Sequence, residues 1–178
     1  MRYRNLPNIL TITRIVMIPG FVAALMLGHY YTAGVIFIIA SLTDAADGYI
    51  ARKYDLTSNF GKLMDPLADK VLVFSAFVCL VELGHIPGWM VIVMLARELL
   101  ITGLRSVAVS GGIVIAAGFS GKLKTVFQML AIIAMLFRNQ PFERFGLPVA
   151  AVLLWIALIL TVYSGVEYVT RNSKLLRS

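Results

Sequence analysis

The sequence predicts an all-α integral membrane protein, a bundle of six transmembrane helices with its polar site at the cytoplasmic end. Three observations support this class. The 178 residues are 60% hydrophobic, and the mean hydropathy is +0.87, as is typical of membrane proteins. Six apolar segments each approach the roughly 20 residues that cross a bilayer. Basic residues gather on one side of these segments, which the positive-inside rule makes the cytoplasmic side.

The six apolar segments follow one another with short connections and no linker or repeat. The expected spans are residues 8–27, 33–53, 66–83, 89–109, 122–137 and 146–170. This organisation and the chain length predict one membrane domain over residues 1–178. The first segment contains Arg14 and Pro19 and lacks a small-residue cleavage site, so we expect it to remain as a membrane helix.

The distribution of Lys and Arg predicts the orientation. Eleven lie on the side that holds both termini, and they are Arg2, Arg4, Arg52, Lys53, Lys62, Arg105, Lys122, Lys124, Arg171, Lys174 and Arg177. The other side holds only Arg138 and Arg144. We therefore expect a multi-pass protein of the cell inner (plasma) membrane with both termini cytoplasmic. The net charge of +7 fits an anionic membrane surface or a phosphorylated substrate better than nucleic acid.

Four aspartates dominate the polar part of the chain. Asp44 and Asp47 are three residues apart, and Asp65 and Asp69 are four apart. On helices, each pair shares one face, and residues 59–61 (Asn-Phe-Gly) predict a turn between the two helices. Four carboxylates repel one another and are costly to desolvate, which indicates bound cations. All-oxygen ligation suits Mg²⁺, Mn²⁺ or Ca²⁺ better than zinc.

The same stretch resembles the signature of the CDP-alcohol phosphotransferases, D-x2-D-G-x2-A-R-x8-G-x3-D-x3-D. Every position is matched, by Asp44, Asp47, Gly48, Ala51, Arg52, Gly61, Asp65 and Asp69. The resemblance implies a metal-dependent phosphatidyltransferase with two divalent ions, Mg²⁺ or Mn²⁺. It implies that the four aspartates ligate the metals and that Asp69 is also the catalytic base. It also implies a homodimer. A salt-bridge network with neighbouring basic residues remains the structural alternative for the acids.

The resemblance also implies a binding site for CDP-diacylglycerol. Family members bind the cytidine nucleotide through the start of the first membrane helix and through residues after the signature arginine. The expected contacts are Asn8, Thr11, Gly48, Arg52, Ser58 and Gly61. Gly48 leaves room for a ligand against the backbone, and Arg52 is long enough to reach a phosphate. A helix N-cap role for Asn8 or Thr11 is an equally good interpretation.

A second basic set indicates the acceptor alcohol. Arg97 and Arg105 are eight residues apart on one predicted helix, and Lys122 and Lys124 open the next. A basic cluster at a helix start is suited to binding phosphate. Lys122 and Lys124 could instead mark only the membrane interface, and Arg97 could pair with Glu98.

These segments, together with the opening P-N-I-L-T-I-T-R, resemble the phosphatidylglycerophosphate synthases. That resemblance implies transfer of a phosphatidyl group from CDP-diacylglycerol to glycerol 3-phosphate, a step of phospholipid biosynthesis that gives phosphatidylglycerol phosphate and CMP. The same chemistry with inositol phosphate or serine as the acceptor is the alternative. An ion-coupled transporter is a remote alternative, because its acids would line a path across the membrane.

Overall fold

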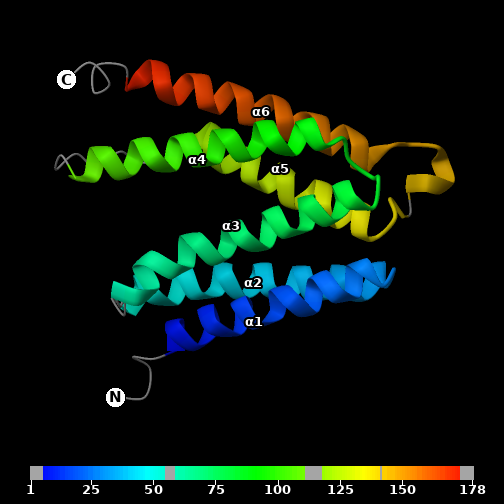
Figure 1. Ribbon diagram of the computed structural model, residues 1–178, viewed down its shortest axis with the longest axis horizontal. Coiled ribbons are helices and arrows are strands. Elements are labelled where there is room, and N and C mark those ends of the chain that lie inside the picture. Colours follow the sequence, from blue (N-terminus) through cyan, green and yellow to red (C-terminus); the bar gives the residue numbers. More distant parts are fainter. Residues whose placement is uncertain (1–5, 55–58, 111–117, 141, 173–178) are drawn as a thin grey trace. The chain divides into compact units, whose positions relative to one another are not determined.

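A computed structural model of the chain describes residues 6–54, 59–110, 118–140 and 142–172 (Figure 1). Side chains are described for these residues except 6–12, 14, 44–54, 59–69 and 110. The described residues form six α-helices and one short 3-10 helix, and they contain no strand. The predicted all-α class is therefore confirmed.

Each predicted apolar segment corresponds to one α-helix, with some differences at the ends. The helices are α1 (Leu6–Met26), α2 (Tyr30–Tyr54), α3 (Asn59–Glu82), α4 (Gly88–Ser110), α5 (Phe119–Leu136) and α6 (Val149–Arg171), and the 3-10 helix η1 is Phe142–Phe145. A short connection joins the end of α3 at Glu82 to the start of α4 at Gly88. Gly84 lies there with φ of 74°, a left-handed conformation that glycine adopts without strain.

The predicted turn at residues 59–61 is wrong. Helix α3 begins at Asn59, so Asn59, Phe60 and Gly61 form its first turn. Asparagine is favoured at helix starts, and the first turn of a helix tolerates residues that break its interior, since its N–H groups have no partner within the helix. The helix also continues through Pro66, the first residue of the apolar segment predicted at residues 66–83.

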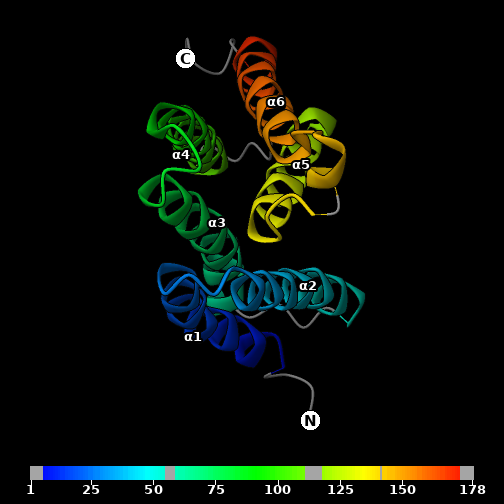
Figure 2. The same cartoon turned by 90° about the vertical axis from the view of Figure 1, so that its right-hand side faces the viewer.

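Helices α1, α2 and α3 form one compact unit, which comprises Met1–Gly84 and Leu136–Arg138. Helix α1 packs against both α2 and α3, and α2 also contacts α3 (Figure 2). The buried side chains include Phe21 of α1, Phe37 of α2 and Phe77 of α3. The Phe21 and Phe37 rings lie with centroids 5.8 Å apart. This aromatic core fixes the three helices that carry the acidic stretch and the N-terminal motif.

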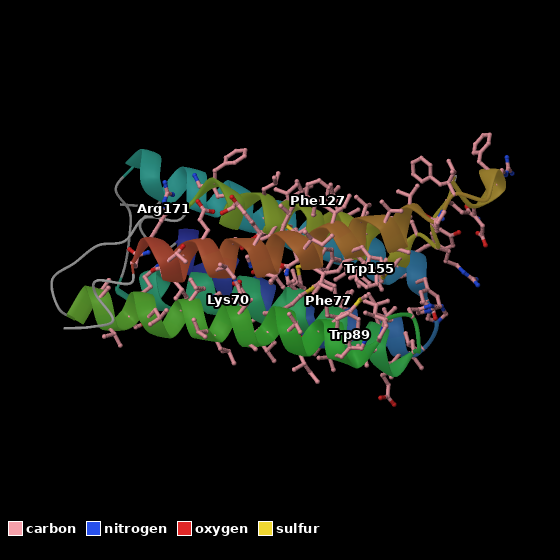
Figure 3. All side chains as sticks on the ribbon, turned by 90° about the horizontal axis from the view of Figure 1, so that it is seen from above. Lys70, Phe77, Trp89, Phe127, Trp155 and Arg171 are labelled. Atoms are coloured by element: carbon pink, nitrogen blue, oxygen red, sulfur yellow. The ribbon has the colours of Figure 1, made fainter. Side chains whose placement is uncertain are left out.

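The second compact unit comprises His85–Met135 and Asn139–Ser178 and contains α4, α5 and α6. Helix α4 packs against α6, and Met94, Ile132 and Leu158 are buried in this unit. Trp89 and Trp155 lie close together toward one end of it, and Arg171 lies toward the other end (Figure 3). The unit therefore has an aromatic end and a basic end.

The helices expose large apolar side chains, as expected of a membrane protein. Val16, Ile92, Val107 and Ile159 are 62–70% exposed, whereas soluble monomers rarely expose large contiguous apolar patches. By length and composition, α5 and α6 are each able to cross a membrane, and α1 and α2 contain shorter apolar stretches. Cys79, the single cysteine of the sequence, is buried and unpaired.

Candidate functional site

The four aspartates lie on two consecutive helices of the first unit. Asp44 and Asp47 are in α2, and Asp65 and Asp69 are in α3. Both helices are continuous through these positions, so the spacings of three and four keep each pair on one side of its helix. Residues 55–58 connect the helices, and this short connection keeps the joined ends within about 18 Å of each other. The acids therefore belong to the same end of the unit, where α2 and α3 meet (Figure 1).

The acids also lie at similar depths from that end. Asp47 is seven residues before the end of α2, and Asp65 is six residues after the start of α3. At 1.5 Å per residue, each is about 10 Å along its helix. Their side chains are outside the described part, and the side chains that are described contain no group of three or more His, Cys, Asp or Glu able to hold a metal. The metal prediction therefore depends on register and donor chemistry.

Five of the six predicted nucleotide-binding residues lie on α1, α2 or α3. Gly48 and Arg52 continue the α2 register after the first two acids, and Gly61 lies in the first turn of α3. Asn8 and Thr11 are the third and sixth residues of α1, so the alternative N-cap role is wrong for both. The start of α1 lies at the same end of the unit as the connection between α2 and α3 (Figure 1). Ser58 falls outside the described residues.

Two of the four predicted acceptor residues meet inside the second unit. Arg97 donates through Nη1 to Glu98 Oε1 at 2.6 Å, and Lys124 of α5 donates to the same oxygen. Arg97 also donates through Nη2 to Ser164 Oγ of α6 at 3.0 Å. Only 4% of the Lys124 side chain is exposed, and 14% of that of Glu98. Residues from three helices thus converge on one buried ion cluster.

Two further hydrogen bonds extend this cluster into a polar stripe between α5 and α6. Ser120 Oγ donates to Glu167 Oε2 at 2.5 Å, and Gln128 Nε2 donates to Thr161 Oγ1 at 3.4 Å. With Lys124, the α5 members recur every four residues. The other members of the stripe were not predicted from the sequence, and they are Ser120, Gln128, Thr161, Ser164 and Glu167. Their helical spacing within apolar segments is the signal that identifies them.

The other two predicted acceptor residues lie apart from the cluster. Lys122 is exposed, because two residues correspond to about 200° around a helix and put it on the opposite side of α5 from Lys124. Arg105 lies about 12 Å along α4 from Arg97. It is half-buried, and its Nε is buried without a hydrogen-bond partner among the described atoms.

Two glycines leave room for the Arg97 side chain. A Cβ at Gly165 of α6 would lie 3.1 Å from Arg97 Cγ, and one at Gly121 of α5 would lie 3.7 Å from Arg97 Nη2. The first distance is shorter than ordinary van der Waals contact. Arg97 is therefore held by hydrogen bonds at its end and by close packing along its stem.

A groove of about 370 Å³ lies beside Arg97 between α4 and α6. Its lining is apolar apart from Arg97 and Thr170, and it includes Leu100, Ile101, Val162 and Val166. Arg97 directs one Nη1 donor to Glu98 and one Nη2 donor to Ser164, and the rest of the lining is almost entirely apolar. The groove itself therefore suits hydrocarbon better than a charged headgroup.

Comparison with known proteins identifies the family. The family model described as CDP-alcohol phosphatidyltransferase matches residues 4–163, which span both compact units. A protein of Bacillus subtilis named CDP-diacylglycerol–glycerol-3-phosphate 3-phosphatidyltransferase is 43% identical, over 98% of each chain. A protein of Haemophilus influenzae with the same name is 41% identical over 92% of this chain and 91% of its own. A probable phosphatidylglycerophosphate synthase of Mycobacterium tuberculosis is 44% identical over 96% of this chain and 82% of its own. Together with the complete signature on α2 and α3, these matches show that the chain is an enzyme that belongs to the CDP-alcohol phosphatidyltransferase family.

Proposed function

We propose that the chain transfers a phosphatidyl group from CDP-diacylglycerol to glycerol 3-phosphate, giving phosphatidylglycerol phosphate and CMP. The main support is the match over nearly the whole chain to relatives named for this activity. The complete aspartate signature on two consecutive helices supports the same conclusion. Membership of a transferase family leaves the ion-coupled transporter without support.

Asp44, Asp47, Asp65 and Asp69 would hold two divalent metal ions, Mg²⁺ or Mn²⁺. The donor set fits this assignment, because four carboxylates supply only oxygen ligands and suit hard cations. The helical register fits as well, since it keeps the acids in two same-face pairs at the joined ends of α2 and α3. Two bound ions would neutralise the diphosphate of the donor substrate and stabilise the attacking and leaving oxygens.

The reaction breaks one P–O bond and forms another. The sn-1 hydroxyl of glycerol 3-phosphate attacks the phosphorus that carries diacylglycerol, and the oxygen that links this phosphorus to CMP leaves with the nucleotide. Asp69 is the proposed base that takes the hydroxyl proton. For the CDP-diacylglycerol headgroup we propose contacts from Arg52 and the backbone at Gly48 and Gly61, with Asn8, Thr11 and Ser58 near the nucleotide.

For the acceptor phosphate we propose Arg97, Arg105, Lys122 and Lys124. The support differs among them. Arg97 and Lys124 share a buried carboxylate, which explains how two cations remain together in apolar surroundings. Arg105 retains an unpaired buried donor among the described atoms. Lys122 is exposed and lies two residues from Lys124, so its support is limited to an additional positive charge near the cluster.

For the membrane topology we propose six transmembrane helices in one domain. The lengths of the α-helices, 18 to 25 residues, support this reading, as do their exposed apolar side chains. The excess of basic residues on the side of the termini supports a cytoplasmic active site in the inner membrane. A homodimer is proposed from family resemblance alone.

One assay tests the proposed function. Purified protein is supplied with CDP-diacylglycerol, Mg²⁺ and one alcohol at a time, and CMP release is measured. Glycerol 3-phosphate should give the fastest release, well above glycerol, serine, inositol phosphate and a control without acceptor. Faster release with serine or inositol phosphate would show that this alcohol is the acceptor, while the phosphatidyl transfer itself would remain as proposed. No CMP with any alcohol would overturn the transfer reaction itself.

A further inference from the structure

Glu98 is the only residue that joins the two buried cations in the described hydrogen bonds of the second unit. A single oxygen, Oε1, accepts from Arg97 Nη1 at 2.6 Å and from Lys124 Nζ. The three side chains are between 4% and 14% exposed. Two cations this close repel one another, and an uncompensated buried charge is strongly unfavourable. A carboxylate between them allows both to stay charged.

We propose that Glu98 is a positioning residue, which holds Arg97 and Lys124 as a preformed pair of donors for the phosphate of the acceptor alcohol. This inference rests on the proposed function, because it assigns a role within the acceptor site. Glu98 itself does not contact the acceptor, since an anion would repel the phosphate. It acts through the two cations that it holds.

The cluster offers an anionic ligand two cationic side chains, Arg97 and Lys124, which share the carboxylate of Glu98. Arg97 Nε is also buried and has no hydrogen-bond partner among the described atoms. A buried cationic donor without a partner is costly, so an additional acceptor oxygen would be stabilised there.

Other contacts hold Arg97 against movement away from this arrangement. Ser164 Oγ accepts from Nη2 at 3.0 Å and in turn donates to the Thr161 carbonyl at 3.1 Å. Gly165 lies directly against the aliphatic stem. These contacts involve Arg97 alone, whereas Glu98 contacts both cations. Loss of Glu98 would therefore remove the partner that Arg97 and Lys124 share. Preformed donors bind more tightly because less ordering accompanies binding.

The first experiment compares Glu98→Gln and Glu98→Asp with the wild type in the CMP-release assay. Gln keeps the shape and loses the charge. The KM for glycerol 3-phosphate should rise about 10-fold or more, because one of the two cations is no longer held where it donates a charge-assisted hydrogen bond to the phosphate. The KM for CDP-diacylglycerol should stay within about 2-fold of wild type. Asp restores the charge and should recover part of the acceptor affinity.

Glu167→Gln is the matched control. Glu167 is also a partly buried carboxylate that accepts a hydrogen bond between α5 and α6, from Ser120, but its described partners do not include Arg97 or Lys124. Its substitution should leave both KM values near wild type. If Glu98→Gln and Glu167→Gln lowered the melting temperature and raised both KM values alike, Glu98 would be merely structural and the inference would fail.

A double-mutant cycle tests whether Glu98 acts through Lys124. If it does, Glu98→Gln should raise the acceptor KM much less in a Lys124→Met background than in the wild type. Fully additive effects would overturn the inference. Should a variant be folded but too slow to assay, the shift of its melting temperature by glycerol 3-phosphate supplies the affinity comparison.

Failure of this inference is distinguishable from failure of the proposed function. If the wild type uses glycerol 3-phosphate and Glu98→Gln leaves the acceptor KM unchanged, the proposed function stands and the positioning role of Glu98 is wrong. If the wild type uses serine instead, both the proposed acceptor and the positioning role of Glu98 are wrong, because serine has no phosphate. If inositol phosphate is the preferred alcohol, the same KM comparisons are made with it.

Discussion

The indole rings of Trp89 and Trp155 lie with their centroids 6.0 Å apart and their planes tilted by 58°. They come from α4 and α6, and each side chain is about half exposed. Tryptophan is enriched where a membrane meets water. Arg171 closes the other end of α6, so the second unit has the aromatic-to-basic polarity expected between the external and cytoplasmic surfaces.

This polarity predicts the labelling of single cysteines in intact cells, on a Cys79→Ala background. A cysteine at Ser178 should resist a membrane-impermeant thiol reagent if the C-terminus is cytoplasmic, as the excess of basic residues on its side predicts. A cysteine at Glu143, an exposed residue of η1, is the matched control and should be labelled readily. Labelling at Ser178 but not at Glu143 would reverse the orientation.

Metal dependence is expected from the four aspartates. EDTA should abolish CMP release, and Mg²⁺ or Mn²⁺ should restore it. Asp44→Asn and Asp65→Asn should each lower kcat by at least roughly 10²- to 10³-fold, the effect of losing one group that stabilises charge in the transition state. Direct titration with Mn²⁺ should show weaker binding in both variants.

Asp55→Asn is the control for that series, because Asp55 belongs to the same stretch but not to the signature. It should retain activity and Mn²⁺ binding near wild type. Full activity of the wild type in rigorously metal-free buffer would contradict the two-metal assignment.

Most of the helical architecture could be predicted from the sequence, because apolar runs of about 20 residues have few other stable solutions in a membrane. The start of α3 could not, since Asn59 and Gly61 favour turns as well as helix starts. Composition alone does not decide between these roles. The complete aspartate signature identified the family, and the comparisons confirm it.

The ion cluster illustrates what sequence reasoning misses. Glu98 and Lys124 are 26 residues apart on different helices, and nothing local to either residue indicates that they meet. Lys122 and Lys124 are close in sequence, which predicts a single basic cluster. Helical geometry separates them, leaving one exposed and the other buried.

Loss of Arg105 should weaken the use of the acceptor selectively. One charge-assisted hydrogen bond contributes roughly 1.5–3 kcal/mol, so Arg105→Ala should lower kcat/KM for glycerol 3-phosphate about 10- to 150-fold. The KM for CDP-diacylglycerol should change little. Glycerol, which should be a poor acceptor of the wild type, should be nearly insensitive to the substitution, because it has no phosphate to make the lost contact.

Arg144→Ala, which removes an exposed arginine of η1, is the control for Arg105→Ala and should leave both acceptors unaffected. If Arg105→Ala lowered kcat/KM for glycerol and for glycerol 3-phosphate equally, Arg105 would not bind the phosphate, and the loss would indicate general destabilisation.

Gly165→Ala should disturb Arg97 without changing any charge. The added Cβ would lie 3.1 Å from Arg97 Cγ, so the stem must move by a few tenths of an ångström. A 1 Å displacement can lower a rate about 10²-fold, so this smaller shift should raise the KM for glycerol 3-phosphate roughly 3- to 10-fold. Gly103→Ala is the matched control on α4, since its added Cβ would have no described atom within 4 Å beyond its chain neighbours and the adjacent backbone of its own helix. Both substitutions should favour the helix by about 0.5–1 kcal/mol, but only Gly165→Ala should change the acceptor KM. Unchanged kinetics in both variants would show that the position of Arg97 is not important for acceptor binding.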